Sequence, residues 1–154
     1  MSGPITLHPA GMAHLDILAA LHEAGFPIGE RWDVEAFRAL MAMNGTQVTM
    51  ACCGSVPVGF LMARLCLDEA EILTLTVHPD ARRKGIARHL LDACIRTLKE
   101  QDATSLFLEV SVNNRPACSL YERAGFMSCG IRRHYYPDGS DARLLRYDLL
   151  TIIR

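Results

Sequence analysis

The chain has 154 residues, of which 50% are hydrophobic, and this suits one domain over residues 1–154. Sixteen Lys and Arg against 17 Asp and Glu give a formal charge of −1, which argues against nucleic acid as the main ligand. The first residues lack a secretory signal, and no apolar run approaches the ~18 residues that span a bilayer, so we expect a soluble, cytoplasmic protein that does not use a membrane.

The first half of the chain predicts two helices among short strands. Gly25 and Pro27 oppose helix continuation, Asp33 can cap the second helix, and a hairpin turn lies around Gly54. The apolar periodicities predict strands over residues 5–8, 46–53, 58–67 and 72–77, and helices over residues 12–24 and 33–43.

A basic, glycine-containing turn follows the strand over residues 72–77. Gly85 lets the backbone approach a ligand closely, Ala87 is small, and the next helix begins there. The first amides of a helix lack intrahelical partners and carry partial positive charge, so they can bind a pyrophosphate, and cationic side chains surround them. These cations are Arg82, Arg83, Lys84 and Arg88. The alternative is a basic turn whose glycine only relieves strain.

The second half alternates strands and helices. We expect a long helix from residue 86, a strand over residues 105–112, a helix over residues 115–124, and final strands over residues 126–136 and 143–150. Asn113 or Asn114 caps the shorter helix, and Gly125 ends it. A strand, a helix and a strand in succession imply a right-handed crossover between parallel strands. The expected fold is therefore one α/β domain with a mixed sheet.

Polar side chains alternate with apolar ones on the two strands of this parallel pair. Glu109 lies between the apolar Leu108 and Val110, while Thr74 and Thr76 lie opposite the face that Leu73, Leu75 and Val77 would share. A carboxylate and two hydroxyl groups would then face one cleft at the carboxyl ends of the strands, where α/β proteins bind ligands. The alternative is a solvated polar face.

The six cysteines show no C-x-x-C pair and no zinc-finger spacing with histidine. We therefore expect reduced thiols that serve as small core residues, and no metal site. Nothing local favours a cysteine nucleophile.

Two separated motifs resemble those of the GNAT N-acetyltransferases. The turn matches their acyl-CoA motif through Arg82, Gly85 and Ala87. The later segment matches their second block through Asn114, Ala117, Leu120, Tyr121, Gly125 and Phe126. The resemblance implies the GNAT (acyl-CoA N-acyltransferase) fold, with a mixed, mostly antiparallel seven-stranded sheet, a splayed parallel pair and about four helices. It also implies acetyl-CoA as the co-substrate, with no metal.

Within that family the chain looks most like the RimI-type ribosomal-protein alanine N-acetyltransferases. The segments 67–70, 108–110, 124–126 and 131–137 carry this likeness. His134 stands where the family commonly has Asn, and residues 26–32 depart from its F-P-W-S/T loop, which shapes the acceptor site in relatives. The implied acceptor is the N-terminal α-amine of a protein, with a small-molecule amine or a non-catalytic acyl-CoA-binding regulator as alternatives.

The resemblance also implies a role for individual residues. Glu109 matches the general base and Tyr121 the general acid, although Tyr121 without the motif would be a core aromatic. The backbone of Leu75, Thr76 and Val77 would bind the acetyl and pantetheine arm. The pyrophosphate would lie on Arg83, Lys84, Gly85, Ile86, Ala87 and Arg88. Asn114 matches a further cofactor contact, or is only a helix cap, or both.

Acidic residues leave one further question about the acceptor. Asp68, Glu69, Glu71 and Glu30 can steer a basic peptide tail, or the first three can simply form a solvated hairpin. The oligomeric state is left open.

Overall fold

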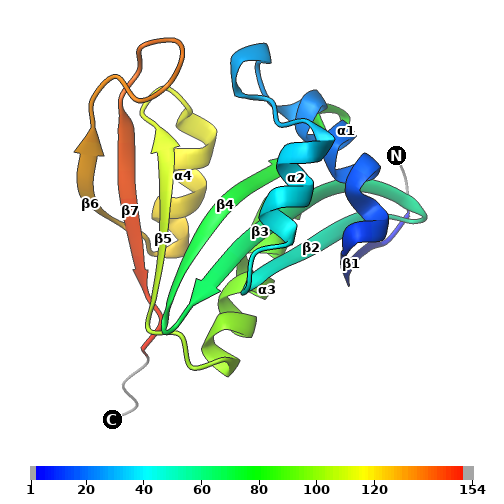
Figure 1. The fold of residues 1–154 in the computed structure, drawn as a ribbon, viewed down its shortest axis with the longest axis horizontal. Helices are drawn as coiled ribbons and strands as arrows, with labels where there is room; N and C mark the ends of the chain where they lie inside the picture. Colours follow the sequence, from blue (N-terminus) through cyan, green and yellow to red (C-terminus); the bar gives the residue numbers. More distant parts are fainter. Residues whose placement is uncertain (1–2, 151–154) are drawn as a thin grey trace.

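The computed structural model describes residues 3–150 and contains a seven-stranded mixed sheet in the order β1-β2-β3-β4-β5-β7-β6 (Figure 1). The strands are β1 (Ile5–Pro9), β2 (Thr46–Cys53), β3 (Val56–Cys66), β4 (Glu69–Val77), β5 (Ser105–Ser111), β6 (Met127–Arg132) and β7 (Ala142–Asp148). The helices are α1 (Leu15–Gly25), α2 (Val34–Met41), α3 (Ile86–Glu100) and α4 (Arg115–Ala124). The predicted fold, with one parallel pair and four helices, is confirmed.

Most strand boundaries lie within two residues of the predicted ones, and two differ by three or more for reasons of pairing. β4 begins at Glu69 instead of residue 72, because Leu67 adopts a left-handed φ of 57° and closes a tight turn that pairs Glu69 with Cys66. β6 ends at Arg132 instead of residue 136, because its partner β7 begins only at Ala142. Residues 133–141 therefore form a loop between the two strands.

The helices cover the sheet in two layers, each with its own core. α1 and α2 pack on one face, where Leu18 and Phe37 meet Phe60 and Met62 of β3. α3 and α4 pack on the other face, and their apolar stripes join a larger cluster with the inward side chains of β5 and β7. Each fully buried leucine or phenylalanine contributes about 1.5–3 kcal/mol, so these two clusters hold the sheet rigid.

The parallel pair opens partway along its length. β4 pairs with β5 only from Glu69 to Glu71, opposite residues 105–107, and beyond that point the two strands diverge (Figure 1). Within β4 the pairing with β3 shifts by one residue, so that Leu73 forms a bulge. Leu73 therefore packs with the α1–α2 cluster, whereas Leu75 and Val77 pack with the α3–α4 cluster. The expectation that these three side chains share one face is wrong because it assumed regular alternation.

No helix among residues 3–150 is long and apolar enough to cross a membrane. In the same part of the chain, no group of three or more His, Cys, Asp and Glu is arranged to hold a metal ion. All six cysteines are free thiols, and four of them are buried; the expectation that they are core residues is wrong for Cys66 and Cys129, which are exposed.

Candidate active site

A cavity of about 620 Å³ lies where β4 and β5 separate. Four residues with a predicted catalytic or cofactor-binding role line it together: Leu75 from β4, Glu109 from β5, and Asn114 and Tyr121 from the segment that forms α4; Thr74, predicted to face the cleft, lines it too. The other predicted residues, Thr76, Val77 and the turn over residues 83–88, do not line this cavity. The structure therefore brings the two candidate catalytic groups together and places the basic turn apart from them.

Glu109 projects toward the face of the sheet that carries α1 and α2. Its neighbours Leu108 and Val110 belong to the α3–α4 cluster, so the alternation of β5 turns Glu109 to the opposite side. The Glu109 carboxylate lies 3.2 Å from Nε of Arg132. A hydrogen bond to Glu109 also raises the pKa of Tyr135, with a further contribution from burial. The candidate base is thus held by a cation and a phenol from the β6–β7 side.

Tyr121 approaches the cavity from the opposite face. It lies on α4, is only 6% exposed, and packs edge-on against Phe126 with ring centroids 5.4 Å apart. Burial raises the pKa of Tyr121 above its usual range, and the neighbouring thiol of Cys94 adds to the effect. The phenol therefore keeps its proton at neutral pH, as a general acid must before it acts. Because the ring also belongs to the core, the role as a packing aromatic accompanies the chemical one.

The predicted phosphate-binding turn has the backbone that its sequence demands. Gly85 is the N-cap of α3 and adopts a left-handed φ of 74°, which glycine tolerates without steric cost. A Cβ at this position would meet nothing within 4 Å, so conformation and not lack of space requires glycine. Arg82 ties the turn to β4, since its Nε donates to the Val77 carbonyl at 3.3 Å. The Arg88 side chain pairs with Asp92 one turn further along the helix, at 2.9 Å.

Asn114 and Thr76 each have a defined structural role. The Asn114 Oδ1 accepts a hydrogen bond from the Ala117 backbone N–H at 3.2 Å, so Asn114 is the cap of α4. Thr76 is buried beneath the end of α1, where a Cβ on Gly25 would lie 2.0 Å from the Thr76 hydroxyl oxygen. Glycine at residue 25 thus lets α1 approach β4 closely.

An aromatic stack from α1 and the loop after it forms part of the cavity wall. His22 lies between Phe26 and Trp32, with ring centroids 4.1 Å and 4.7 Å away, and its Nδ1 accepts the Trp32 backbone N–H at 3.3 Å. Burial lowers the pKa of His22 to about 4, so the ring is neutral. All three residues line the cavity. Trp32 therefore supplies the aromatic surface of a loop whose sequence departs from the family pattern.

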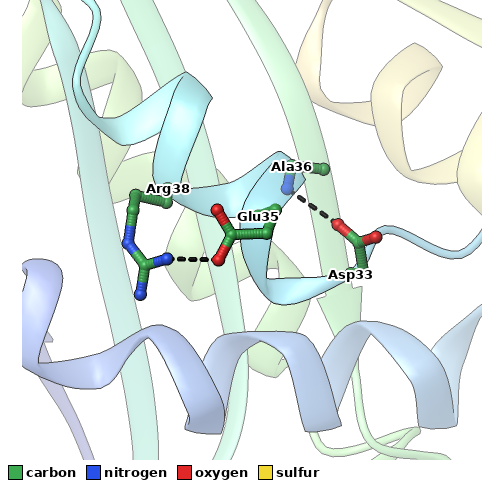
Figure 2. A network of polar contacts seen from close by, with 4 residues as sticks. All are labelled: Asp33, Glu35, Ala36 and Arg38. Carbon is green, nitrogen blue, oxygen red and sulfur yellow. Dashed lines mark hydrogen bonds and ion pairs between the residues drawn. The ribbon is translucent and has the colours of Figure 1, made fainter.

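The segment that follows Trp32 is anchored by α2. The Asp33 Oδ1 accepts the Ala36 backbone N–H at 2.8 Å, and Glu35 in the first turn of α2 forms an exposed ion pair with Arg38 (Figure 2). Asp33 thus satisfies one of the free amides of the helix, as the sequence predicted.

Sequence reasoning gave His22 no site role and named Tyr135 and Tyr136 only within the segment over residues 131–137 that carries the family likeness, although all three residues line this cavity. It noted Glu71 only as a possible steering charge, yet Glu71 lines the cavity, and burial and the nearby Glu109 raise its pKa. Burial also raises the pKa of Tyr136 to about 12. His22 on the apolar side of a helix and Glu71 on a strand both have ordinary structural explanations. No local signal therefore marks either of them as a residue of the site. His134, in contrast, is exposed and bonds within its own loop, to Asp141 and Gly139.

A second cavity, of about 840 Å³, continues from the first along the α1–α2 face. The two cavities share Leu40, Glu71, Leu73, Leu108 and Glu109. The second runs between the end of α2 and β6, and Arg132, Asp68 and Glu69 line it. Glu109 therefore stands where the two cavities meet.

The features described above are those of an acyl-CoA N-acyltransferase. They are a splayed parallel pair, a carboxylate and a phenol on opposite sides of the opening, and a basic helix N-terminus beyond it. Residues 13–126 match the model of the acetyltransferase (GNAT) family, and the chain belongs to this family.

Named relatives lie among the N-terminal acetyltransferases. A ribosomal protein bS18-alanine N-acetyltransferase of Escherichia coli (strain K12) is 39% identical over 88 residues, which cover 56% of this chain and 60% of that protein. An N-alpha-acetyltransferase of Saccharolobus solfataricus is 29% identical over 153 residues, covering 91% of this chain and 90% of the relative.

Solved structures agree over the whole fold. The crystal structure of the ribosomal-protein-S18-alanine N-acetyltransferase from Escherichia coli superposes with a TM-score of 0.90 at 26% identity, covering 98% of this chain and 97% of that one. Arabidopsis thaliana NAA60 in complex with acetyl-CoA superposes with a TM-score of 0.82 at 23% identity, covering 94% and 98%.

Proposed function

We propose that this protein acetylates the N-terminal α-amine of a protein, of the ribosomal-protein alanine type, with Glu109 as the general base and Tyr121 as the general acid. The observation that carries the proposal is the position of these two groups, which border one cavity from opposite faces of the opened sheet. The relatives named above support the class of acceptor.

The proposed reaction is a direct transfer. Glu109 takes a proton from the acceptor ammonium, because an α-amine with a pKa near 8 is largely protonated at neutral pH and cannot attack. The nitrogen lone pair then forms a bond to the thioester carbon. As the carbon–sulfur bond breaks, the leaving thiolate takes the phenolic proton of Tyr121, and the proton still held in excess by the amide nitrogen returns to the tyrosinate directly or through water.

The donor would lie on the α3–α4 side of the opening. The backbone of Leu75, Thr76 and Val77 would pair with the acetyl and pantetheine arm in the manner of an added strand, since β4 has no strand partner on that edge beyond Glu71. A backbone N–H there would polarise the thioester carbonyl. Residues 83–88 would bind the pyrophosphate at the start of α3, and Asn114 would contact the cofactor while it caps α4.

The second cavity favours a peptide acceptor over a small amine. A small amine needs only the space beside Glu109, whereas an acceptor with several residues needs a continuous path away from it, and the cavity toward β6 provides one. Glu71 and Glu69 on this path would favour a basic segment after the N-terminus. A non-catalytic regulator would need neither Glu109 nor Tyr121.

Thiol release from acetyl-CoA tests the proposal directly. The wild-type protein is incubated with a peptide that begins with alanine, with the same peptide blocked at its N-terminus, and with a polyamine. We expect release with the free peptide alone. Faster release with the polyamine would assign a small-molecule acceptor, and acetyl-CoA binding without release in any mixture would assign the regulator.

A further inference from the structure

Thr74 is a buried residue of β4 whose hydroxyl group has no partner. The side chain is 7% exposed and lines the 620 Å³ cavity. Within residues 3–150, its Oγ1 is the one buried side-chain nitrogen or oxygen atom without a hydrogen bond. Other buried polar groups are bonded: the hydroxyl of Ser105 accepts from Arg146 at 3.1 Å, and His22 accepts from Trp32.

An unbonded buried hydroxyl lowers the stability of the free protein. A valine has nearly the same shape and would fill the same space without burying a polar atom that has lost its bonds to water. A threonine at this position therefore needs a reason other than packing. Because the hydroxyl borders the cavity, a substrate group is the natural partner.

The pairing of β4 shows which side of the sheet Thr74 faces. Thr74 lies opposite Met62 of β3, and directly opposed residues of antiparallel strands project to the same face. Met62 belongs to the α1–α2 cluster, so Thr74 faces that side. Glu109 faces it too, from the other strand of the opened pair, whereas Tyr121 borders the cavity from the α3–α4 side.

We propose that the Thr74 hydroxyl accepts a hydrogen bond from the acceptor amine while Glu109 takes its proton. A primary amine that has given up one proton still carries two N–H groups, and a bond from one of them to Thr74 would fix the direction of the nitrogen lone pair. Two acceptors on the two edges of the opening would hold the nitrogen between the strands. This inference rests on the proposed acetylation of an amine and adds to it a second contact for that amine.

The test compares Thr74→Val, which removes the hydroxyl and keeps the shape, with Thr74→Ser, which keeps the hydroxyl. Both are measured against wild type for kcat and KM with an alanine-starting peptide, for acetyl-CoA affinity by calorimetry, and for thermal unfolding. We expect Thr74→Val to lower kcat/KM for the peptide roughly 10- to 100-fold, the range of one lost hydrogen bond to a charged or reacting group. Thr74→Ser should stay within about 5-fold of wild type.

The Thr74→Val substitution should lower activity without lowering the stability of the fold. Thr74→Val should bind acetyl-CoA as wild type does and unfold at the same temperature or about 2–4 °C higher, because the unbonded hydroxyl is gone. A Thr74→Val protein with wild-type kcat/KM would overturn the inference. Weaker acetyl-CoA binding by Thr74→Val would also overturn it, because the hydroxyl would then contact the donor. A lower unfolding temperature for Thr74→Val, with a wild-type unfolding temperature for Thr74→Ser, would overturn it as well, because the role of the hydroxyl would then be structural. The proposed function fails separately, if wild type itself releases no thiol with any amine.

Discussion

The two sides of the cavity are built in different ways. On the donor side, the groups that would bind the cofactor are backbone amides and carbonyls of one continuous segment, from the end of β4 to the start of α3, and Gly85 sets their geometry. On the acceptor side, the wall consists of side chains from distant segments: His22 and Trp32 from the first quarter of the chain, and Tyr135 from the last. One side depends on local conformation, and the other depends on tertiary packing.

The two sides should therefore respond differently to substitution. A backbone site tolerates most side chains as long as the conformation is kept, whereas a site made of side chains changes with each substitution. Glu109 borders the shared cavity from the α1–α2 face, and Tyr121 borders it from the α3–α4 face. Variants on each side should therefore separate donor binding, acceptor binding and chemistry.

Substitutions of the two central residues should have the largest effect. Glu109→Gln removes the proton acceptor and Tyr121→Phe removes the phenolic proton, and each should lower kcat roughly 10²–10⁴-fold while acetyl-CoA still binds. Calorimetry with acetyl-CoA and steady-state kinetics with the peptide measure the two quantities. Wild-type turnover in either variant would remove that residue from the mechanism.

The donor turn should show the next largest effect. Gly85→Glu should lower acetyl-CoA affinity at least about 100-fold, because a carboxylate at the helix N-terminus repels the pyrophosphate. Gly85→Ala is the control, since it introduces the same strain at a φ of 74°, about 1–2 kcal/mol, without the charge. Equal acetyl-CoA affinities in the two variants would show that the turn binds no anion.

The local conformation of the segments that would bind the donor was predictable from the sequence because the signals there are local. Three features depend on neighbours within a few residues: Gly85 at a helix start, Asn114 as a cap, and the alternation around Glu109. The structure places Gly85 and Asn114 at those caps and Glu109 on the expected face. The family motifs fall on the same segments. The fold followed because the order of strands and helices leaves few topologies.

The acceptor side could not be predicted because its determinants are tertiary. The His22 ring is held in the wall by Phe26 and Trp32, which stack on it only after the chain turns at Gly25. The side that Leu73 faces depends on a bulge, which a period of two cannot reveal. Tyr135 meets Glu109 only because residues 133–141 leave the sheet as a loop, where regular alternation predicted a longer strand.

The neutral His22 makes the stability of the acceptor wall dependent on pH. Its pKa is about 4 in the folded protein against about 6.5 when unfolded, so above pH 6.5 neither state is charged. As the pH falls below 6.5 the unfolded state binds the proton first, and the free energy of unfolding should drop by about 2 kcal/mol between pH 7 and pH 5. Urea unfolding at the two pH values measures the loss.

His22→Asn is the matched control for this prediction, because the amide oxygen can accept the Trp32 N–H but does not titrate. Its free energy of unfolding should fall by about 2 kcal/mol less than that of wild type over the same pH interval. An equal loss in both proteins would mean that His22 is not the group responsible.

The cap of α2 should show the smallest effect and the most selective one. Asp33→Ala removes the acceptor for the Ala36 N–H (Figure 2), and it should lower the free energy of unfolding by about 1 kcal/mol. Because Trp32 precedes this cap and Leu40 of α2 lines both cavities, KM for the peptide should rise about 2- to 5-fold while acetyl-CoA affinity stays the same. Glu35→Gln breaks only the exposed pair with Arg38. It should leave KM unchanged and alter the free energy of unfolding by no more than about 0.5 kcal/mol. A parallel loss of acetyl-CoA affinity in Asp33→Ala would show that the two sides of the cavity are coupled and not separately built.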